Sequence, residues 1–107
     1  MRIFKFGGAS IKDAQAIRNV IHVLQTVGFS NSLIIASAMG KTTNALEDVI
    51  NAYFKKPDDL KKNIQFVQEY HLNVMNDLFQ NENDSIFSDV NNLFVEYENC
   101  SSRNRIC

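Results

Sequence analysis

Lys5-Phe6-Gly7-Gly8-Ala9-Ser10 is the stretch that decides the fold, because it sets a glycine pair directly after a short apolar run. The run from residue 3 to residue 6 predicts a strand, and the glycines allow a sharp turn after it. Backbone N–H groups at such a turn can approach an anion closely, and the lysine supplies a positive charge. The stretch therefore indicates either a phosphate-binding corner or a plain tight turn beside a surface lysine.

A second polar corner, Ser37-Ala38-Met39-Gly40-Lys41-Thr42-Thr43-Asn44, follows another apolar run, Leu33-Ile34-Ile35-Ala36. This run does not alternate with polar residues, which is typical of a parallel strand covered on both faces. Consecutive parallel strands end at the same edge of their sheet, so we expect the two corners to line one crevice. The pair of corners favours a piece of an enzyme over a domain without a site.

Helical periodicity separates the two corners. Apolar residues at helical spacing predict a first helix over residues 14 to 24. Ser10 precedes Asp13 by three residues, a capping-box pattern that starts a helix, and Gly28 suits a left-handed cap at its end.

Three further apolar stripes predict helices after the second corner, over residues 46 to 53, 60 to 78 and 86 to 97. Asn44 and Glu47 form a capping-like pair at the start of the first of them, and Pro57 separates the first from the second. No periodicity survives from residue 99 to residue 107, which we expect to form an irregular tail. The element order is therefore β-α-β-α-α-α.

That order describes only part of a sheet. A β-α-β unit implies a parallel pair of strands with a right-handed crossover, and parallel sheets usually have more strands than this and a cover on both faces. We therefore expect the chain to be the front portion of a larger α/β domain.

Composition excludes several classes of function. The chain has 107 residues and a net charge of −1, so it carries no basic field for sequence-independent nucleic-acid binding. Its two cysteines, Cys100 and Cys107, suggest neither a disulfide framework nor a zinc site. It shows neither a signal peptide nor an apolar run long enough to span a bilayer, so we expect a cytoplasmic protein without a membrane partner.

Other candidates for chemistry are weaker. Gly40-Lys41-Thr42 matches the tail of the P-loop motif, but that motif needs a glycine where Ile35 stands. His71 falls within an apolar stripe and is expected to be a packed histidine. No arrangement of Ser, His and Asp for nucleophilic catalysis is visible.

With both corners in hand, the sequence resembles the N-terminal part of an aspartate kinase, in the amino-acid kinase family. The first corner is similar to that family's Lys-Phe-Gly-Gly-Thr-Ser opening. The second is similar to its Ser-Ala-Met-Gly turn, which is followed by Thr and by Asp or Asn. The resemblance covers residues 1–98, and it implies a partial amino-acid kinase domain there with a helical insertion at 45–98. The implied fold is a mainly parallel sheet between two layers of helices, here truncated.

The resemblance also implies a reaction and its residues. The reaction is ATP-dependent phosphorylation of the β-carboxylate of L-aspartate, with Mg²⁺ as a cofactor, in a homo-oligomeric complete enzyme. Lys5 would be the catalytic residue and would bind ATP together with Gly7, Gly8 and Ser10. Aspartate would be held by a second set, namely Ser37, Ala38 and Thr43. No residue of the chain is implied as a metal ligand.

Two departures from the family pattern matter. Ala9 stands where the family usually has threonine, and the family's downstream substrate-binding and adenine-binding segments are missing from this chain. The chain alone is therefore expected to be inactive. Two alternatives stay open at this point: a fragment of a P-loop-like NTPase, and a non-catalytic helical interaction module.

Overall fold

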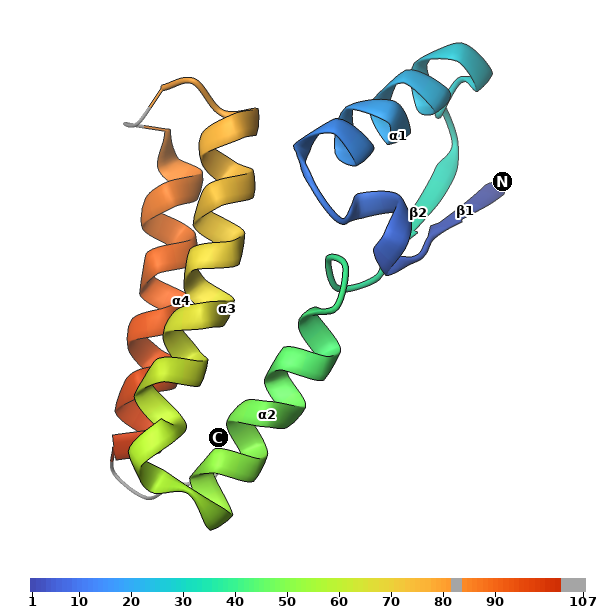
Figure 1. The fold of residues 1–107 in the computed structure, drawn as a ribbon. Helices are drawn as coiled ribbons and strands as arrows, with labels where there is room; N and C mark the ends of the chain where they lie inside the picture. Colours follow the sequence, from blue (N-terminus) through green and yellow to red (C-terminus); the bar gives the residue numbers. More distant parts are fainter. Residues whose placement is uncertain (82–83, 103–107) are drawn as a thin grey trace. The chain divides into compact units, whose positions relative to one another are not determined.

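The structure is a computed structural model that describes residues 1–81 and 84–102. Its elements, in chain order, are the strand β1 (Arg2–Phe6), the short 3₁₀ helix η1 (Gly8–Ile11), the helix α1 (Ala14–Val27), the strand β2 (Ser32–Ala36), and the helices α2 (Thr42–Lys55), α3 (Pro57–Leu78) and α4 (Ser85–Ser102) (Figure 1). The chain divides into two compact units, which we call the N-terminal unit (Met1–Thr43) and the helical unit (Asn44–Cys107). The protein is thus α/β, with both strands in the N-terminal unit and α3 and α4 in the helical unit.

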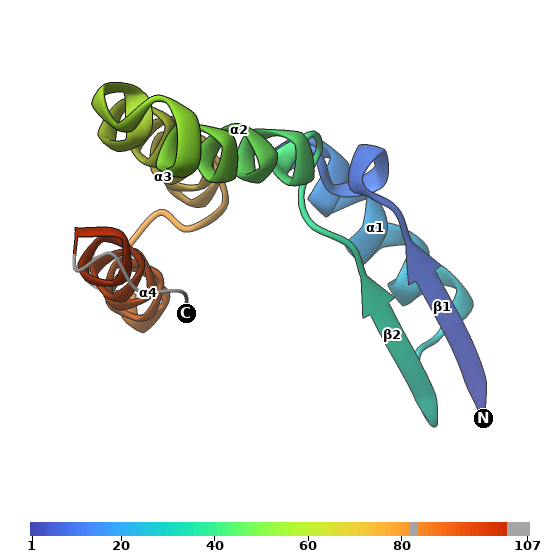
Figure 2. The same ribbon diagram turned by 90° about the horizontal axis from the view of Figure 1, so that it is seen from below.

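The N-terminal unit is built on a parallel pair of strands. β1 and β2 pair in register from Arg2 opposite Ser32 to Phe6 opposite Ala36, and α1 makes the connection between them (Figure 2). The predicted parallel pair and crossover helix are therefore confirmed. Because side chains alternate along a strand, Phe4 and Phe6 share one face, where their rings stack with centroids 6.5 Å apart.

The start of α1 differs from the prediction. The helix is capped by Asp13, whose carboxylate accepts a hydrogen bond from the backbone N–H of Ala16 at 2.8 Å. Ser10 is not the cap, because it lies within η1, where its N–H donates to the carbonyl of Gly7. The predicted end is confirmed: Gly28 has a φ of 87°, and its N–H donates to the carbonyl of Leu24.

The strands are less covered than their apolar sequence predicts. Leu33 is 47% exposed, and Ile34 and Ile35 are each 44% exposed. The expectation that β2 is covered on both faces is thus wrong for the described residues, in which the sheet has two strands. With so few strands and one crossover helix, too little chain packs against the apolar faces to bury them.

The helical unit has a conventional side-chain core. Val49 of α2 and Ile64 and Val67 of α3 are buried together. Partly buried residues from all three helices pack against them, namely Ala45, Leu46, Leu60, Phe94 and Tyr97. The three helices predicted after the second corner are therefore confirmed, and Pro57 occupies the first turn of α3, where a missing N–H costs nothing.

His71 is a packed histidine, as predicted. Its Nδ1 lies 2.8 Å from the carbonyl oxygen of Val67, and its ring centroid lies 6.1 Å from that of Phe94.

Two helix boundaries differ from the prediction. α2 begins at Thr42, so Asn44 lies inside the helix rather than capping it. α4 continues to Ser102, so the first residues of the expected irregular tail are helical. Loss of apolar periodicity after residue 98 therefore does not by itself end a helix, because backbone helix can continue without an apolar stripe. The rest of that tail, 103–107, lies outside the described residues.

Candidate functional site

The two glycine-bearing corners meet in the N-terminal unit. The backbone N–H of Gly40 donates to the carbonyl of Gly8 at 2.9 Å, and the N–H of Ser37 donates to the carbonyl of Phe6 at 3.0 Å. These two bonds join the chain leaving β1 directly to the chain leaving β2. The two corners therefore lie together at one sheet edge, as predicted, while the crevice expected between them stays a prediction.

Gly8 is a glycine because the second corner packs against it. A Cβ atom at this position would lie 2.6 Å from the carbonyl oxygen of Gly40 and 2.9 Å from that of Ala38. Real Cβ atoms do not come this close to backbone oxygens, so any side chain would force the corners apart. Gly40 also has a positive φ of 53°, which favours glycine. Gly8 and Gly40 therefore form the close backbone contact at which the two corners pack together.

Gly7 has no such reason to be a glycine. Its φ of −76° is open to any residue, and a Cβ atom there would have nothing within 4 Å. The space beside its Cα is thus empty of the described chain. A glycine that the fold does not need is typical of a place where an outside group approaches the backbone closely.

Lys5 lies on the face of β1 opposite the Phe4–Phe6 pair, because side chains alternate along the strand. It is exposed, and its neighbour in the register is Ile35. A primary ammonium on a long flexible stem can reach beyond the end of the strand from this position.

The remaining predicted site residues are also exposed. Ser10 and Ala9 line a groove of about 390 Å³ that runs between η1 and α1. Ser37 and Ala38 lie in the second corner, and Thr43 lies in the first turn of α2. The N–H of Ser37 is hydrogen-bonded to the first corner, and the carbonyl of Ala38 packs against Gly8. For Ser10 and Thr43 it shows exposed hydroxyl groups near the start of their helices.

Thr42 is the residue of this site whose structural role sequence reasoning missed. Its side chain is 8% exposed, and its hydroxyl donates to the carbonyl of Met39 at 2.6 Å. The signal was present, because threonine is a favoured residue at a helix start. The hydroxyl therefore fixes the turn between Met39 and α2.

The Thr42 and Gly40 bonds bear on the P-loop alternative. In a P-loop, the threonine hydroxyl binds Mg²⁺ and the backbone N–H groups cradle phosphates. Here the Thr42 hydroxyl donates a hydrogen bond to the Met39 carbonyl, and the Gly40 N–H donates one to the Gly8 carbonyl. Both groups are thus engaged within the fold, which disfavours the alternative.

Two further properties of the described residues are relevant to function. Among the side chains that the structure describes, which belong to 1–81 and 84–99, no group of three or more from His, Cys, Asp or Glu is placed to hold a metal ion. Over the same residues, no helix combines the length and apolar character that crossing a bilayer requires.

In comparison with known proteins, the relatives described here all carry an aspartokinase name. No protein-family model matches the chain. The chain is 29% identical over 96 residues to bifunctional aspartokinase/homoserine dehydrogenase 2, chloroplastic, of Arabidopsis thaliana, an alignment that covers 85% of this chain and 10% of that protein. It is 29% identical over 80 residues to aspartokinase 2, chloroplastic, of the same plant, covering 71% of this chain and 14% of that protein.

A third relative comes from another plant. The chain is 30% identical over 69 residues to bifunctional aspartokinase/homoserine dehydrogenase, chloroplastic, of Daucus carota, covering 64% of this chain and 8% of that protein. The chain thus spans between 8% and 14% of the length of these curated relatives. It has weak, partial similarity to plant aspartokinases.

Proposed function

We propose that residues 1–98 form a piece of an amino-acid kinase domain of the aspartokinase type. Its reaction is the ATP-dependent phosphorylation of the β-carboxylate of L-aspartate, the first step toward lysine, threonine and methionine. The observation that carries the proposal is the pair of backbone bonds that join Gly8 to Gly40 and Phe6 to Ser37. They bring a lysine-bearing corner and a hydroxyl-bearing corner to one sheet edge. The similarity to plant aspartokinases supports the same reading.

The first corner is proposed to bind the phosphates of ATP. Gly7 leaves open space in which a phosphate oxygen can approach the backbone. Lys5 is exposed near the end of β1, where its ammonium can offset the charge that develops on the transferred phosphoryl group. Gly8 and Ser10 complete this side of the proposed site, and Mg²⁺ would bind together with the phosphates.

The second corner is proposed to hold aspartate. Ser37 and Thr43 offer exposed hydroxyl groups, and Ala38 offers backbone without a bulky side chain. The interlocked glycines keep these groups at a fixed distance from the first corner. Fixed distance matters because phosphoryl transfer depends mainly on positioning and on electrostatic stabilisation.

The chemistry needs no general base. The attacking carboxylate is already ionised at neutral pH, since an aspartate side chain has a pKa of about 3.9. A bond forms between a carboxylate oxygen and the γ-phosphorus, the bond from that phosphorus to the bridging oxygen breaks, and ADP leaves. No proton has to be moved, so the absence of a His–Asp pair among the predicted site residues is compatible with this reaction.

The proposal assigns an incomplete site to this chain. The resemblance implies that adenine-binding and further substrate-binding groups come from segments beyond the match, so we expect the 107-residue chain alone to show no turnover. The cytoplasmic location also stays a prediction, because the relatives are named as chloroplastic proteins.

Binding can be measured on the chain itself. We expect MgATP to shift the backbone amide resonances of the first corner in an isotope-labelled sample, with a Kd on the order of millimolar because much of the site is missing. Lys5→Ala should abolish these shifts. Lys41→Ala is the matched control, because Lys41 is also an exposed lysine at a glycine corner. Loss of binding in Lys41→Ala and not in Lys5→Ala would favour the P-loop alternative instead.

Turnover can be measured in a hybrid in which residues 1–98 replace the corresponding segment of Arabidopsis aspartokinase 2, which includes the 80 residues that match. In an active hybrid, Lys5→Ala should lower kcat on the order of 100-fold or more, as expected when a group that stabilises transition-state charge is removed. Lys41→Ala should change kcat only slightly. A folded, active hybrid in which Lys5→Ala has no effect would refute the assigned role.

A further inference from the structure

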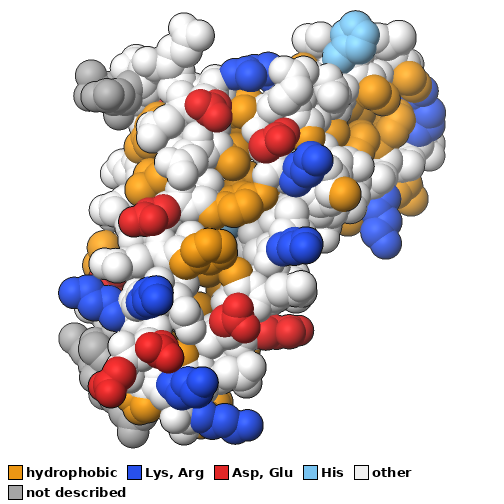
Figure 3. Space-filling model, in the orientation of Figure 1, with side chains coloured by type: hydrophobic (Ala, Val, Ile, Leu, Met, Phe, Trp, Pro, Cys, Tyr) orange, Lys and Arg blue, Asp and Glu red, His pale blue; other side chains and the backbone are white. Residues whose placement is uncertain are grey.

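The helix α3 exposes an aromatic side chain at the edge of its core, beside α2. The buried residues of α3 are Ile64, Val67, Val74 and Met75. Phe66 lies on a different face, beside α2, and is 62% exposed. A phenylalanine carries a large apolar surface that solvent does not favour. In the space-filling view, apolar side chains lie among acidic and basic ones on the face that is drawn (Figure 3).

Opposite charges flank Phe66 along the same face. Lys62 stands four residues before it and Glu69 three residues after it, and both are exposed. Positions seven apart in a helix share a face, so the two charges and the ring form one stripe. They are separated by about 10 Å along the helix axis, too far for direct contact between neighbouring turns.

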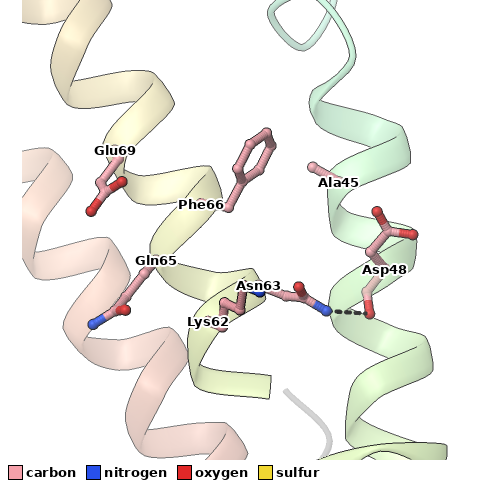
Figure 4. Close-up of a pocket in the computed structure, with 7 residues that line it drawn as sticks. All are labelled: Ala45, Asp48, Lys62, Asn63, Gln65, Phe66 and Glu69. Carbon is pink, nitrogen blue, oxygen red and sulfur yellow. Dashed lines mark hydrogen bonds between the residues drawn. The ribbon is translucent and has the colours of Figure 1, made fainter. Parts of the chain in front are cut away.

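A groove lies beside this stripe. It has a volume of about 360 Å³ and runs between α2 and α3, where the Nδ2 atom of Asn63 donates to the carbonyl of Asp48 at 3.3 Å (Figure 4). The Phe66 ring projects toward the α2 side of this groove, near Ala45 (Figure 4). The same surface thus offers a protruding ring and a hollow next to it.

These features are self-complementary under a twofold axis. If a second α3 packs antiparallel against the first, Lys62 of one copy lies opposite Glu69 of the other, and the reverse pair forms at the same time. The midpoint between Lys62 and Glu69 falls within about 1 Å of Phe66 along the axis. Each ring then meets its counterpart near the axis, next to the partner's groove.

We infer that the Lys62–Phe66–Glu69 face of α3 is a homodimer contact, and that its occupant is a second copy of this chain. Charge complementarity selects that occupant, because the face presents to itself the opposite sign at each charged position. The contact is small, with one aromatic anchor on each side, so the dimer is expected to be weak and to depend on concentration and salt. The inference concerns the helical unit and does not rest on the proposed function.

The experiment is sedimentation velocity on the 107-residue chain over a concentration series, with circular dichroism to confirm that each variant is folded. The wild type should show a reversible monomer–dimer equilibrium. Phe66→Ala should remove the dimer, and either charge reversal, Lys62→Glu or Glu69→Lys, should weaken it by about tenfold, because each places two like-charge pairs in the interface. The double reversal Lys62→Glu/Glu69→Lys restores opposite signs at both positions and should bring the dimer back.

The double reversal separates this contact from other causes of association. A dimer that the single reversals weaken and the double reversal does not restore would overturn the pairing. A wild type that stays monomeric throughout the series would overturn the inference, including the case in which another part of the same chain covers Phe66. Association that survives Phe66→Ala but disappears in Ile35→Lys would assign the contact to the exposed sheet and would also overturn it.

Discussion

Different interactions stabilise each of the two units of this chain internally. In the N-terminal unit the corners are joined by backbone hydrogen bonds, Gly40 to Gly8 and Ser37 to Phe6, while the strand side chains stay largely exposed. In the helical unit the opposite holds, because Val49, Ile64 and Val67 are buried in a side-chain core. The N-terminal unit therefore has two tightly joined corners on a poorly covered sheet, and the helical unit has a well-packed core.

This difference teaches where each kind of substitution acts. In a packed core, stability depends on how much side-chain volume is removed. At an interlocked corner, stability depends on whether there is room for one added carbon. Pairs of similar substitutions, one in each kind of environment, separate the two effects on stability.

The largest expected effect is in the helical core. Ile64 is 2% exposed, so Ile64→Ala should lower the free energy of unfolding of the helical unit by about 2–5 kcal/mol, since it removes buried surface and leaves a cavity. The near-ultraviolet tyrosine signal reports this unit alone, because Tyr53, Tyr70 and Tyr97 all lie in it. Urea unfolding followed by that signal gives the change.

Leu93→Ala is the control for the core, because Leu93 is 65% exposed on α4. It removes a side chain of the same size from an exposed surface and should cost well under 1 kcal/mol, at about the level of ordinary surface substitutions. Equal losses in Ile64→Ala and Leu93→Ala would mean that the buried cluster is not the core of this unit.

The second-largest expected loss of stability is at the contact between the two glycine-bearing corners. Gly8→Ala puts a Cβ atom 2.6 Å from the Gly40 carbonyl oxygen, so the corners must separate, at a cost of about 1–3 kcal/mol. Hydrogen exchange followed by mass spectrometry should show faster exchange at the Ser37 and Gly40 amides. The helical unit should keep its tyrosine signal.

Gly7→Ala tests the same corner without the clash. Nothing lies within 4 Å of a Cβ atom at this position, so the exchange rates should stay as in the wild type. The two glycines thereby separate a packing role from a binding role: Gly7→Ala should weaken MgATP binding while leaving the corner intact. Faster exchange in Gly7→Ala would show that the fold itself needs this glycine.

Much of the fold could be predicted from the sequence. The strands, the crossover helix and the three later helices each have a clear apolar period, and Gly28 marks a helix end. The juxtaposition of the corners follows from the geometry of parallel strands. These features depend on local pattern or on general sheet topology, which a single sequence contains.

The helix cap and the roles of the two glycines could not be predicted, because similar residues compete for each role. Ser10 and Asp13 are both good caps, and only the insertion of η1 decides for Asp13. Gly7 and Gly8 look alike in the sequence, and only the position of the second corner shows that Gly8 is the tightly packed one. The exposure of Leu33 and Ile35 depends on what covers the sheet, which no local pattern specifies.

The third prediction tests the corrected cap. Asp13→Ala removes the carboxylate that accepts from the Ala16 N–H, and it should destabilise the start of α1 by about 1 kcal/mol. Ser10→Ala changes a residue that does not cap α1 and should have a much smaller effect. Exchange rates at the first-turn amides of α1 give both values. A larger effect of Ser10→Ala would restore the capping box that the sequence suggests.

The smallest expected effect returns to the helical core and appears only in alkaline solution. Burial raises the pKa of the Tyr97 phenol above its ordinary value of 10.0. The folded chain therefore holds this proton at a pH at which the unfolded chain has begun to lose it, so stability is unaffected in neutral solution and falls as the pH rises above about 10.

Lysines titrate in the same range, so the measurement is the difference between the wild type and Tyr97→Phe in urea unfolding at increasing pH. The variant cannot ionise there, and its stability should fall less steeply. Parallel curves for the two proteins would show that Tyr97 is as well solvated in the folded state as in the unfolded one, and that α4 does not close the core at this point.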